Sequence, residues 1–146
     1  MSPVRPTFHL LPQIGWKEDV GLPELGLGKL IAKIDTGARS AALHAENISI
    51  MGRRVSFTME LGGKRRSCIA RLSELKRVKS SNGHSELRPL VETDIEIGTH
   101  RFRINISLTD RADMGVPMLL GREAIKGRFL VNPAKRFILS RRKVLA

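Results

Sequence analysis

Residues 29–40 of the chain are Lys29-Leu-Ile-Ala-Lys-Ile-Asp35-Thr36-Gly37-Ala38-Arg39-Ser40. The first half of this stretch is apolar and partly β-branched, which is typical of a strand interior. Asp35 ends the predicted strand, and three small residues then form a tight turn. Partial burial of a carboxyl group is one way in which proteins prepare an acid or a base. Asp35 is therefore a candidate catalytic residue, and the alternative that it merely opens a turn stays open.

The rest of the chain alternates short apolar patterns with turn signals, which is typical of a small barrel or sandwich. The clearest half-buried strand is Val55–Leu61, where every second residue is apolar. The strongest hairpin signal is Asn82-Gly83, whereas residues 73–79 are basic and ambiguous. Further strands are predicted at 14–20, 29–34, 47–51, 65–72, 87–97, 102–108 and 116–120. A last strand pair, 129–131 and 137–139, is expected around Asn132-Pro133, after one helical turn at 122–126.

Length and composition indicate one all-β domain. The chain has 146 residues, of which 41% are hydrophobic and 27% charged, which is enough for a single core. We expect an extended lead-in at residues 1–13 and one domain at 14–146. No apolar run approaches the roughly 20 residues of a membrane span, and no secretory signal is visible. Because Cys68 is the one cysteine, it is expected to be a buried thiol in a cytoplasmic protein.

The charge is strongly positive. Lys and Arg number 26 and Asp and Glu 14, which gives a net charge of +12 and an attraction to polyanions. Aromatic residues make up only 4% of the chain, and little helix is predicted. Stacking platforms and groove-reading helices are therefore scarce, and nucleic acid is not the expected partner. An acidic peptide, or attachment to a ribonucleoprotein particle, would use the same charge.

The turn at Asp35 resembles the Asp-Thr-Gly-Ala signature of retropepsins, the single-domain aspartic proteases of retroviral type. Two later features match the same class in the same order. The Asn82-Gly83 hairpin lies where retropepsins place a flap over the substrate. Leu119-Leu120-Gly121-Arg122 matches their apolar strand and Gly-Arg helix, whose arginine braces the site. The resemblance implies a small closed β-barrel with one short helix near the C-terminus.

A bacterial retropepsin-like family is more similar still, over about residues 14–140. The match is carried by residues 32–38, Ser40, Leu43-His44-Ala45, Arg88-Pro89-Leu-Val91, Asp110-Arg111 and residues 117–122. Its members are usually labelled ATP-dependent zinc proteases, and the family is associated with an ATP-grasp ligase that adds glutamates to a ribosomal protein. The resemblance implies a peptidase with Asp35 as its catalytic residue. We expect a set of substrate-binding residues near Asp35: Thr36, Gly37, Ala38, Arg39, Ser40, Asn82, Gly83 and Arg122.

The zinc and ATP parts of that label find no support in the residues. No His-Glu-x-x-His motif is present, and the four histidines are dispersed, at His9, His44, His84 and His100. His44 is expected to be a packed or hydrogen-bonded histidine near the site. No Gly-x-x-x-x-Gly-Lys loop is present either, so ATP would belong to a partner ligase. We therefore expect no metal and no cofactor.

Arg39 departs from the viral pattern, which has an acidic residue there to pair with the arginine of the Gly-Arg helix. Either Arg122 finds another carboxylate, or Arg39 and Arg122 both face the cleft unpaired, where they would bind carboxylates bidentately. A solvated Arg39 is a further alternative. With the net charge, the second alternative predicts a preference for acidic peptides, above all oligoglutamate tails.

Two hypotheses for function follow. An aspartic peptidase needs two carboxylates that share a proton, and this chain offers one Asp-Thr-Gly. Catalysis therefore requires a homodimer that joins two copies of Asp35, or a second acid such as Asp110 or Asp113. The alternative is a non-catalytic module that binds oligoglutamate peptides and works with the ligase.

Overall fold

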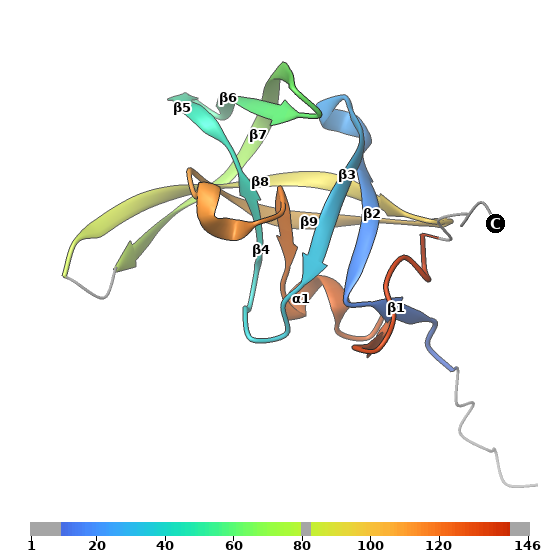
Figure 1. The fold of residues 1–146 in the computed structure, drawn as a ribbon. Helices are drawn as coiled ribbons and strands as arrows, with labels where there is room; N and C mark the ends of the chain where they lie inside the picture. The colour runs from blue at the N-terminus through green and yellow to red at the C-terminus, as the bar shows by residue number, and fades with distance from the viewer. Residues whose placement is uncertain (1–9, 80–82, 141–146) are drawn as a thin grey trace, which may run out of the picture.

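The computed structural model describes residues 10–79 and 83–140. Most of them lie in strands (Figure 1). The strands are β1 (Gln13–Gly15), β2 (Lys17–Leu22), β3 (Leu27–Ile34), β4 (Ala41–His44), β5 (Glu46–Met51), β6 (Arg54–Leu61), β7 (Lys64–Lys79), β8 (Ser85–Ile97), β9 (His100–Thr109), β10 (Met118–Leu120) and β11 (Leu130–Asn132). The helical segments are the 3-10 turns η1 (Pro23–Leu25) and η2 (Ala112–Met114), and the α-helix α1 (Arg122–Ile125).

Six strands close into a barrel. Their order is β2-β3-β10-β4-β9-β8, and β8 pairs back onto β2 through Gly21 and Glu96. The short α1 follows the last of these strands in the chain. The prediction of an all-β closed barrel with one short helix near the C-terminus is therefore confirmed.

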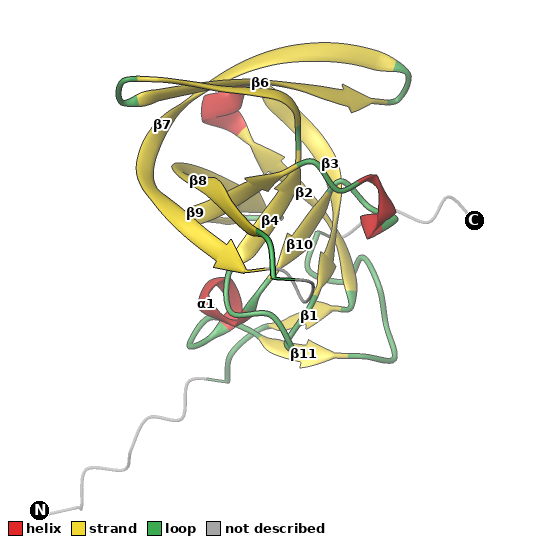
Figure 2. Ribbon diagram, turned by 90° about the vertical axis from the view of Figure 1, so that its left-hand side faces the viewer, coloured by secondary structure: helices red, strands yellow, loops and turns green. Residues whose placement is uncertain are grey.

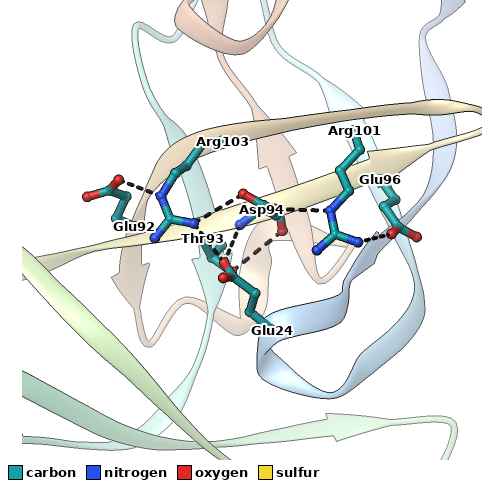
Figure 3. Close-up of polar contacts among 7 residues, drawn as sticks. All are labelled: Glu24, Glu92, Thr93, Asp94, Glu96, Arg101 and Arg103. Atoms are coloured by element: carbon teal, nitrogen blue, oxygen red, sulfur yellow. Dashed lines mark hydrogen bonds and ion pairs between the residues drawn. The ribbon is translucent and has the colours of Figure 1, made fainter.

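Ion pairs on the outer face of β8 and β9 reinforce this closure (Figure 3). Glu24, in the connection from β2 to β3, accepts a hydrogen bond from the backbone N–H of Asp94 on β8 at 2.8 Å. Arg103 on β9 contacts both carboxylates, at 3.0 Å for Glu24 and 3.1 Å for Asp94. Arg101 adds contacts to Asp94 and Glu96, and Arg103 one to Glu92.

The hairpin of β7 and β8 is the element that projects furthest from the barrel (Figure 1). The first half of β7 pairs with β6, and its second half pairs with β8 as far as Lys79 and Ser85. The ambiguous segment 73–79 is thus part of a 16-residue strand. Strands β5, β6 and the start of β7 form a layer at one end of the barrel (Figure 2). The predicted turn residue Asn82 lies outside the described residues.

The core is formed by the alternating strands that the sequence indicates. In β6 the apolar residues Val55, Phe57 and Met59 are all buried, and β9 buries Ile104, Ile106 and Leu108 in the same way. Cys68 is buried as well, and burial raises the pKa of its thiol against a smaller opposing effect of Arg66. This cysteine is therefore a packing residue rather than a reactive one.

The predicted final strand pair is wrong. Residues 130–132 form β11, which pairs in parallel with β1 through Ile14 and Val131 rather than with residues 137–139. The latter form a turn, in which Phe137 has a φ of 56°. The backbone N–H groups of Leu139 and Ser140 donate to the carboxylate of Glu18 instead of to a strand.

Two further strands differ from the sequence-based prediction. The predicted strand 14–20 is divided at Trp16 into β1 and β2, which join different sheets. The strand β4 was missed because Ala41 and Ala42 have little intrinsic preference for strands. It is defined by its neighbours β9 and β10, so only the tertiary structure reveals it. In the described part of the chain, no helix has the length and apolar character needed to cross a membrane.

Candidate active-site groove

Asp35 is held at the carboxyl end of a barrel strand. Strand β3 lies between β2 and β10, and its last residue, Ile34, is paired with Leu120 of β10. The backbone N–H of Asp35 donates to the carbonyl of Leu120 at 2.9 Å, which extends this pairing by one residue. The half-buried Asp35 carboxylate is therefore positioned by two strands rather than by a free loop.

The carboxylate also braces its own turn. Oδ1 of Asp35 accepts a hydrogen bond from the Gly37 N–H at 3.1 Å, and the Asp35 carbonyl accepts one from the Ala38 N–H at 3.2 Å. This is an Asx turn of the kind that aspartate forms in many loops. The structural role of Asp35 is thus present, and it is compatible with a chemical role at the carboxylate.

Helix α1 fixes the other side of the turn. The N–H groups of Arg122 and Glu123 donate to the carbonyls of Ala38 and Arg39, at 2.8 and 3.0 Å. Nη1 of Arg122 donates to the carbonyl of Thr36 at 3.0 Å. The turn that follows Asp35 is therefore tied to the helix by three hydrogen bonds to its backbone.

Gly121 permits this close approach. A Cβ atom on Gly121 would lie 2.5 Å from the carbonyl oxygen of Ser40 and 2.8 Å from the carbonyl carbon of Arg39. Such distances are too short for any side chain, so the backbones of Gly121 and of residues 39–40 can meet only at a glycine. Gly121 thus lets the helix approach the turn closely, and Arg122 holds the turn through its hydrogen bonds.

Arg39 has an ionic partner that the sequence did not suggest. Its Nε lies 2.9 Å from Oε1 of Glu123, and both side chains are largely exposed. Neither alternative for Arg122 holds, that it binds another carboxylate or that it and Arg39 are both unpaired. Arg122 binds a backbone carbonyl, and Arg39 binds a carboxylate. An acid and a base still link the turn to the helix, with their order reversed relative to the viral pattern. Arg39 nevertheless remains at the edge of the groove.

A groove of about 480 Å³ lies between the Asp35 turn and the projecting hairpin. Among the described residues that line it, Asp35 is the one carboxylate. Apolar side chains such as Val78, Leu90 and Leu119 also line this groove. Six cations surround it: Arg39, Lys76, Arg77, Lys79, Arg88 and Arg111. The groove therefore combines one candidate catalytic acid with a strongly positive wall.

The groove contains only part of the predicted substrate-binding set. Ala38, Arg39 and Ser40 line it with Asp35, whereas Thr36, Gly37, Gly83 and Arg122 are not among its lining residues. Asn82 lies outside the described residues. The cations of the hairpin were missed, although the basic run at 76–79 was visible, because its strand was not recognised. Arg88 and Arg111 were noticed only as parts of motifs.

The two other candidate acids do not line the groove. Asp113 lies 3.6 Å from Arg111, and Asp110 lies 3.9 Å from Nδ1 of His44. His44 is hydrogen-bonded, as expected, since its Nδ1 accepts the Arg111 N–H at 3.0 Å. Within residues 10–79 and 83–140, no three His, Cys, Asp or Glu side chains are grouped so that they could hold a metal ion.

A closed barrel of six strands with an Asp-Thr-Gly turn and a Gly-Arg helix defines the retropepsin-like class. The model of the RimB-like family, described as "Retropepsin-like aspartic endopeptidase RimB", matches residues 13–142. The chain therefore belongs to the RimB-like family of retropepsin-like proteins, as its motifs indicate.

Two curated relatives are named "Probable alpha-L-glutamate ligase". The protein of Shewanella halifaxensis is 36% identical over 134 residues, and that of Desulfotalea psychrophila is 35% identical over 129. These matches cover 86% and 83% of this chain but only 29% and 28% of the relatives. The chain thus spans less than a third of their length, and a segment similar to it is part of a longer protein in each.

One solved structure is similar over almost its whole length. The crystal structure of Lpg0085 from Legionella pneumophila, described as a protein of unknown function, superimposes with a TM-score of 0.74 at 33% identity. The match covers 88% of this chain and 98% of that one. It supports the fold, and it adds no assignment of activity.

Proposed function

We propose that this protein is an aspartic peptidase that hydrolyses peptide bonds in acidic, glutamate-rich peptides. The observation that carries the proposal is the groove itself, which is lined by the Asp35 carboxylate and by six cations. The family description as an aspartic endopeptidase supports the reaction. The cationic wall supports the substrate class, because guanidinium groups bind carboxylates bidentately.

The reaction needs a second carboxylate. One ionised carboxylate takes a proton from water while a protonated one donates a hydrogen bond to the scissile carbonyl. No described groove residue other than Asp35 is acidic, so the second group would be Asp35 of another copy of the chain. The two acids would then share one proton and titrate as a pair.

A glutamate-adding partner fits the same chemistry. The relatives that contain a similar segment are named as glutamate ligases, and a ligase of this kind makes the peptide that the positive groove would bind. We propose that this protein acts on the product of such an ATP-grasp ligase, the glutamylated tail of a ribosomal protein. ATP would be used by the ligase.

Cleavage of matched peptides tests this function. The wild type should cleave a glutamate-rich peptide faster than a neutral or a lysine-rich one, and Asp35→Asn should abolish the cleavage while the fold persists. Arg39→Ala should reduce the preference for glutamate, since Arg39 lines the groove. Equal rates for all three peptides, or an Asp35→Asn variant as active as wild type, would contradict the proposal.

The second candidate function is binding without cleavage. It is favoured by the Asx turn, in which the Asp35 carboxylate already has a structural partner. A module of this kind would bind oligoglutamate peptides through the same cations and would hydrolyse none of them. In that case wild type and Asp35→Asn would bind the glutamate-rich peptide equally, and no cleavage product would form in either sample.

A further inference from the structure

The hairpin presents two cations directly opposite each other. Lys76 of β7 is paired with Arg88 of β8, and residues paired in this way place their side chains on the same face of the sheet. Both residues line the groove that contains Asp35. Like charges in opposite positions destabilise a strand pair. This arrangement therefore disfavours the hairpin on its own, and a bound anion would relieve the repulsion.

Arg88 also has an unsatisfied donor. Its Nε is buried and has no hydrogen-bond partner among the described residues. Nη2 has a carboxylate neighbour, Oε2 of Glu86, at 3.8 Å, which is too long for a hydrogen bond. Burying a donor without an acceptor costs free energy, so this guanidinium is not held by a full set of protein partners, and its side chain is still 24% exposed. The guanidinium is thus placed to receive a ligand rather than to hold the hairpin together.

The surroundings of Arg88 indicate the kind of ligand. The N–H donors of the two Nη groups of a guanidinium lie in one plane and form a fork that matches the two oxygens of a carboxylate. The apolar Val78 and Leu90 line the same groove, so the ligand has an aliphatic part as well as a charge. A glutamate side chain has both. Glu86, an exposed residue on the same strand as Arg88, already makes a long carboxylate–guanidinium contact of this kind, at 3.8 Å.

We infer that Arg88, with Lys76 opposite it, is the specificity-determining subsite that binds a glutamate side chain of the substrate. The inference rests on the proposed function and adds which residues read the substrate. Arg88 supplies the fork, and Lys76 supplies a second positive charge. Binding a carboxylate there neutralises the cation pair, so recognition of the substrate also stabilises the hairpin.

Kinetics with Arg88→Lys test the subsite, because lysine keeps the charge and loses the fork. For a glutamate-rich peptide, KM should rise by about tenfold to a hundredfold with little change in kcat. For the matched glutamine-rich peptide, KM should not change. Arg71→Lys is the control, since Arg71 is an exposed arginine on the neighbouring strand β7 but is not among the residues lining this groove. A KM for the glutamate-rich peptide equal to that of wild type would overturn the inference.

Binding separates this inference from the proposed function. If wild type cleaves nothing, the proposed function fails, and the subsite is then tested by fluorescence polarisation with a labelled hexaglutamate peptide. In the Asp35→Asn background, Arg88→Lys should weaken this binding by a similar factor. Unchanged binding would overturn the subsite. Stronger, Arg88-dependent binding of a phosphopeptide would overturn the ligand class.

Lys76→Gln provides a second variant that does not depend on the guanidinium. Removing one of two opposed cations should leave the melting temperature of the free protein unchanged or raise it, because the repulsion is relieved. Binding of hexaglutamate should fall at the same time. A Lys76→Gln variant that binds the peptide as well as wild type would contradict the role of the cation pair.

Discussion

Glu18 is a fully buried carboxylate that holds the C-terminal part of the described chain against β2. Its two oxygens accept hydrogen bonds from the N–H groups of Gly15, Leu139 and Ser140, and from the hydroxyl of Ser140, at 2.6 to 3.0 Å. Four donors compensate for the loss of hydration of a buried charge. Glu18 thereby joins the start of the described chain to residues 139–140, more than 120 positions away, and no local pattern predicts that contact.

Glu18→Gln should destabilise the fold strongly. The amide loses the charge, and its NH₂ group would face a backbone N–H that needs an acceptor, so at least one buried donor is left without a partner. We expect a loss of about 3–5 kcal/mol in the free energy of unfolding, measured by denaturant titration. Glu60→Gln, at an exposed position in β6, is the control. A loss below about 1 kcal/mol would mean that the hydrogen bonds of Glu18 contribute little to stability.

Gly121→Ala should disturb the Asp35 turn without any change in a polar group. The added Cβ would overlap the backbone of Ser40, so the turn or the start of α1 must shift. We expect a loss of about 1–3 kcal/mol in stability and a fall in kcat of peptide cleavage. Gly28→Ala is the matched control, because a Cβ at that position of β3 would meet no atom within 4 Å. Equal effects of the two substitutions would contradict the close-approach role of Gly121.

At the scale of elements, the sequence predicted those strands whose own side chains alternate. The strands at residues 55–61 and 102–108 could be predicted without tertiary information, since every second residue in them is apolar. The second half of β7 was ambiguous because its exposed side chains, such as Leu75 and Arg77, follow no clear alternation. Its partner β8 makes it a strand. Three of the six cations that line the groove, Lys76, Arg77 and Lys79, lie on this segment, so missing the strand meant missing half of the positive wall.

The candidate site likewise has features that local sequence motifs predict and contacts that only the tertiary structure reveals. The turn from Asp35 to Ser40 and the Gly-Arg helix are local motifs, and the sequence placed them together correctly. The partner of Arg39 is Glu123, 84 residues away, and only the packing of α1 on the turn reveals it. Contacts of this kind depend on the registers of β3, β4 and β10, which no single stretch of sequence specifies.

The ion pairs on the outer face of β8 and β9 should make the stability of the barrel sensitive to acid. The hydrogen bond from Arg101, with that from Arg103, lowers the pKa of Asp94, and the hydrogen bond from the Asp94 N–H, with the charge of Arg103, lowers that of Glu24. The carboxylates of Asp94 and Glu24 therefore bind protons more readily in the unfolded chain than in the folded one. The two ionised carboxylates stabilise the fold above a pH of about 4. This stabilisation is lost as the pH falls through their lowered pKa values.

Denaturant unfolding of wild type and Asp94→Asn between pH 3 and 7 measures this effect. Glu24 is exposed and Asp94 is partly exposed, so solvent screening keeps the contribution small. Asp94→Asn should be less stable than wild type at neutral pH, and the two curves should converge as the pH falls. A constant difference between them at every pH would show that ionisation of Asp94 is not the cause. Raising the salt concentration should narrow the difference at neutral pH.

At the scale of the whole molecule, the proposed reaction would find only one of its two carboxylates in the groove of one chain. Asp35 is the one carboxylate among its described lining residues, and the net charge of +12 opposes the approach of two copies. Association should therefore be weak at low salt, and an acidic peptide that neutralises the grooves should favour it. Specific activity should consequently rise with protein concentration, and more steeply when the peptide is present.

Mixing experiments test whether two copies of Asp35 act together. When wild type is mixed with an equal amount of Asp35→Asn, random pairing leaves about half of the wild-type chains in wild-type dimers. Cleavage per wild-type chain should therefore fall to about half, and it should fall further with excess variant. An Asp35→Asn sample that carries Gly121→Ala is a useful comparison, because a disturbed turn should capture wild-type chains less well. Activity that stays proportional to the amount of wild type at every ratio would show that one chain suffices. The second acid would then have to come from the same chain, and Asp110 and Asp113 would be the residues to replace next.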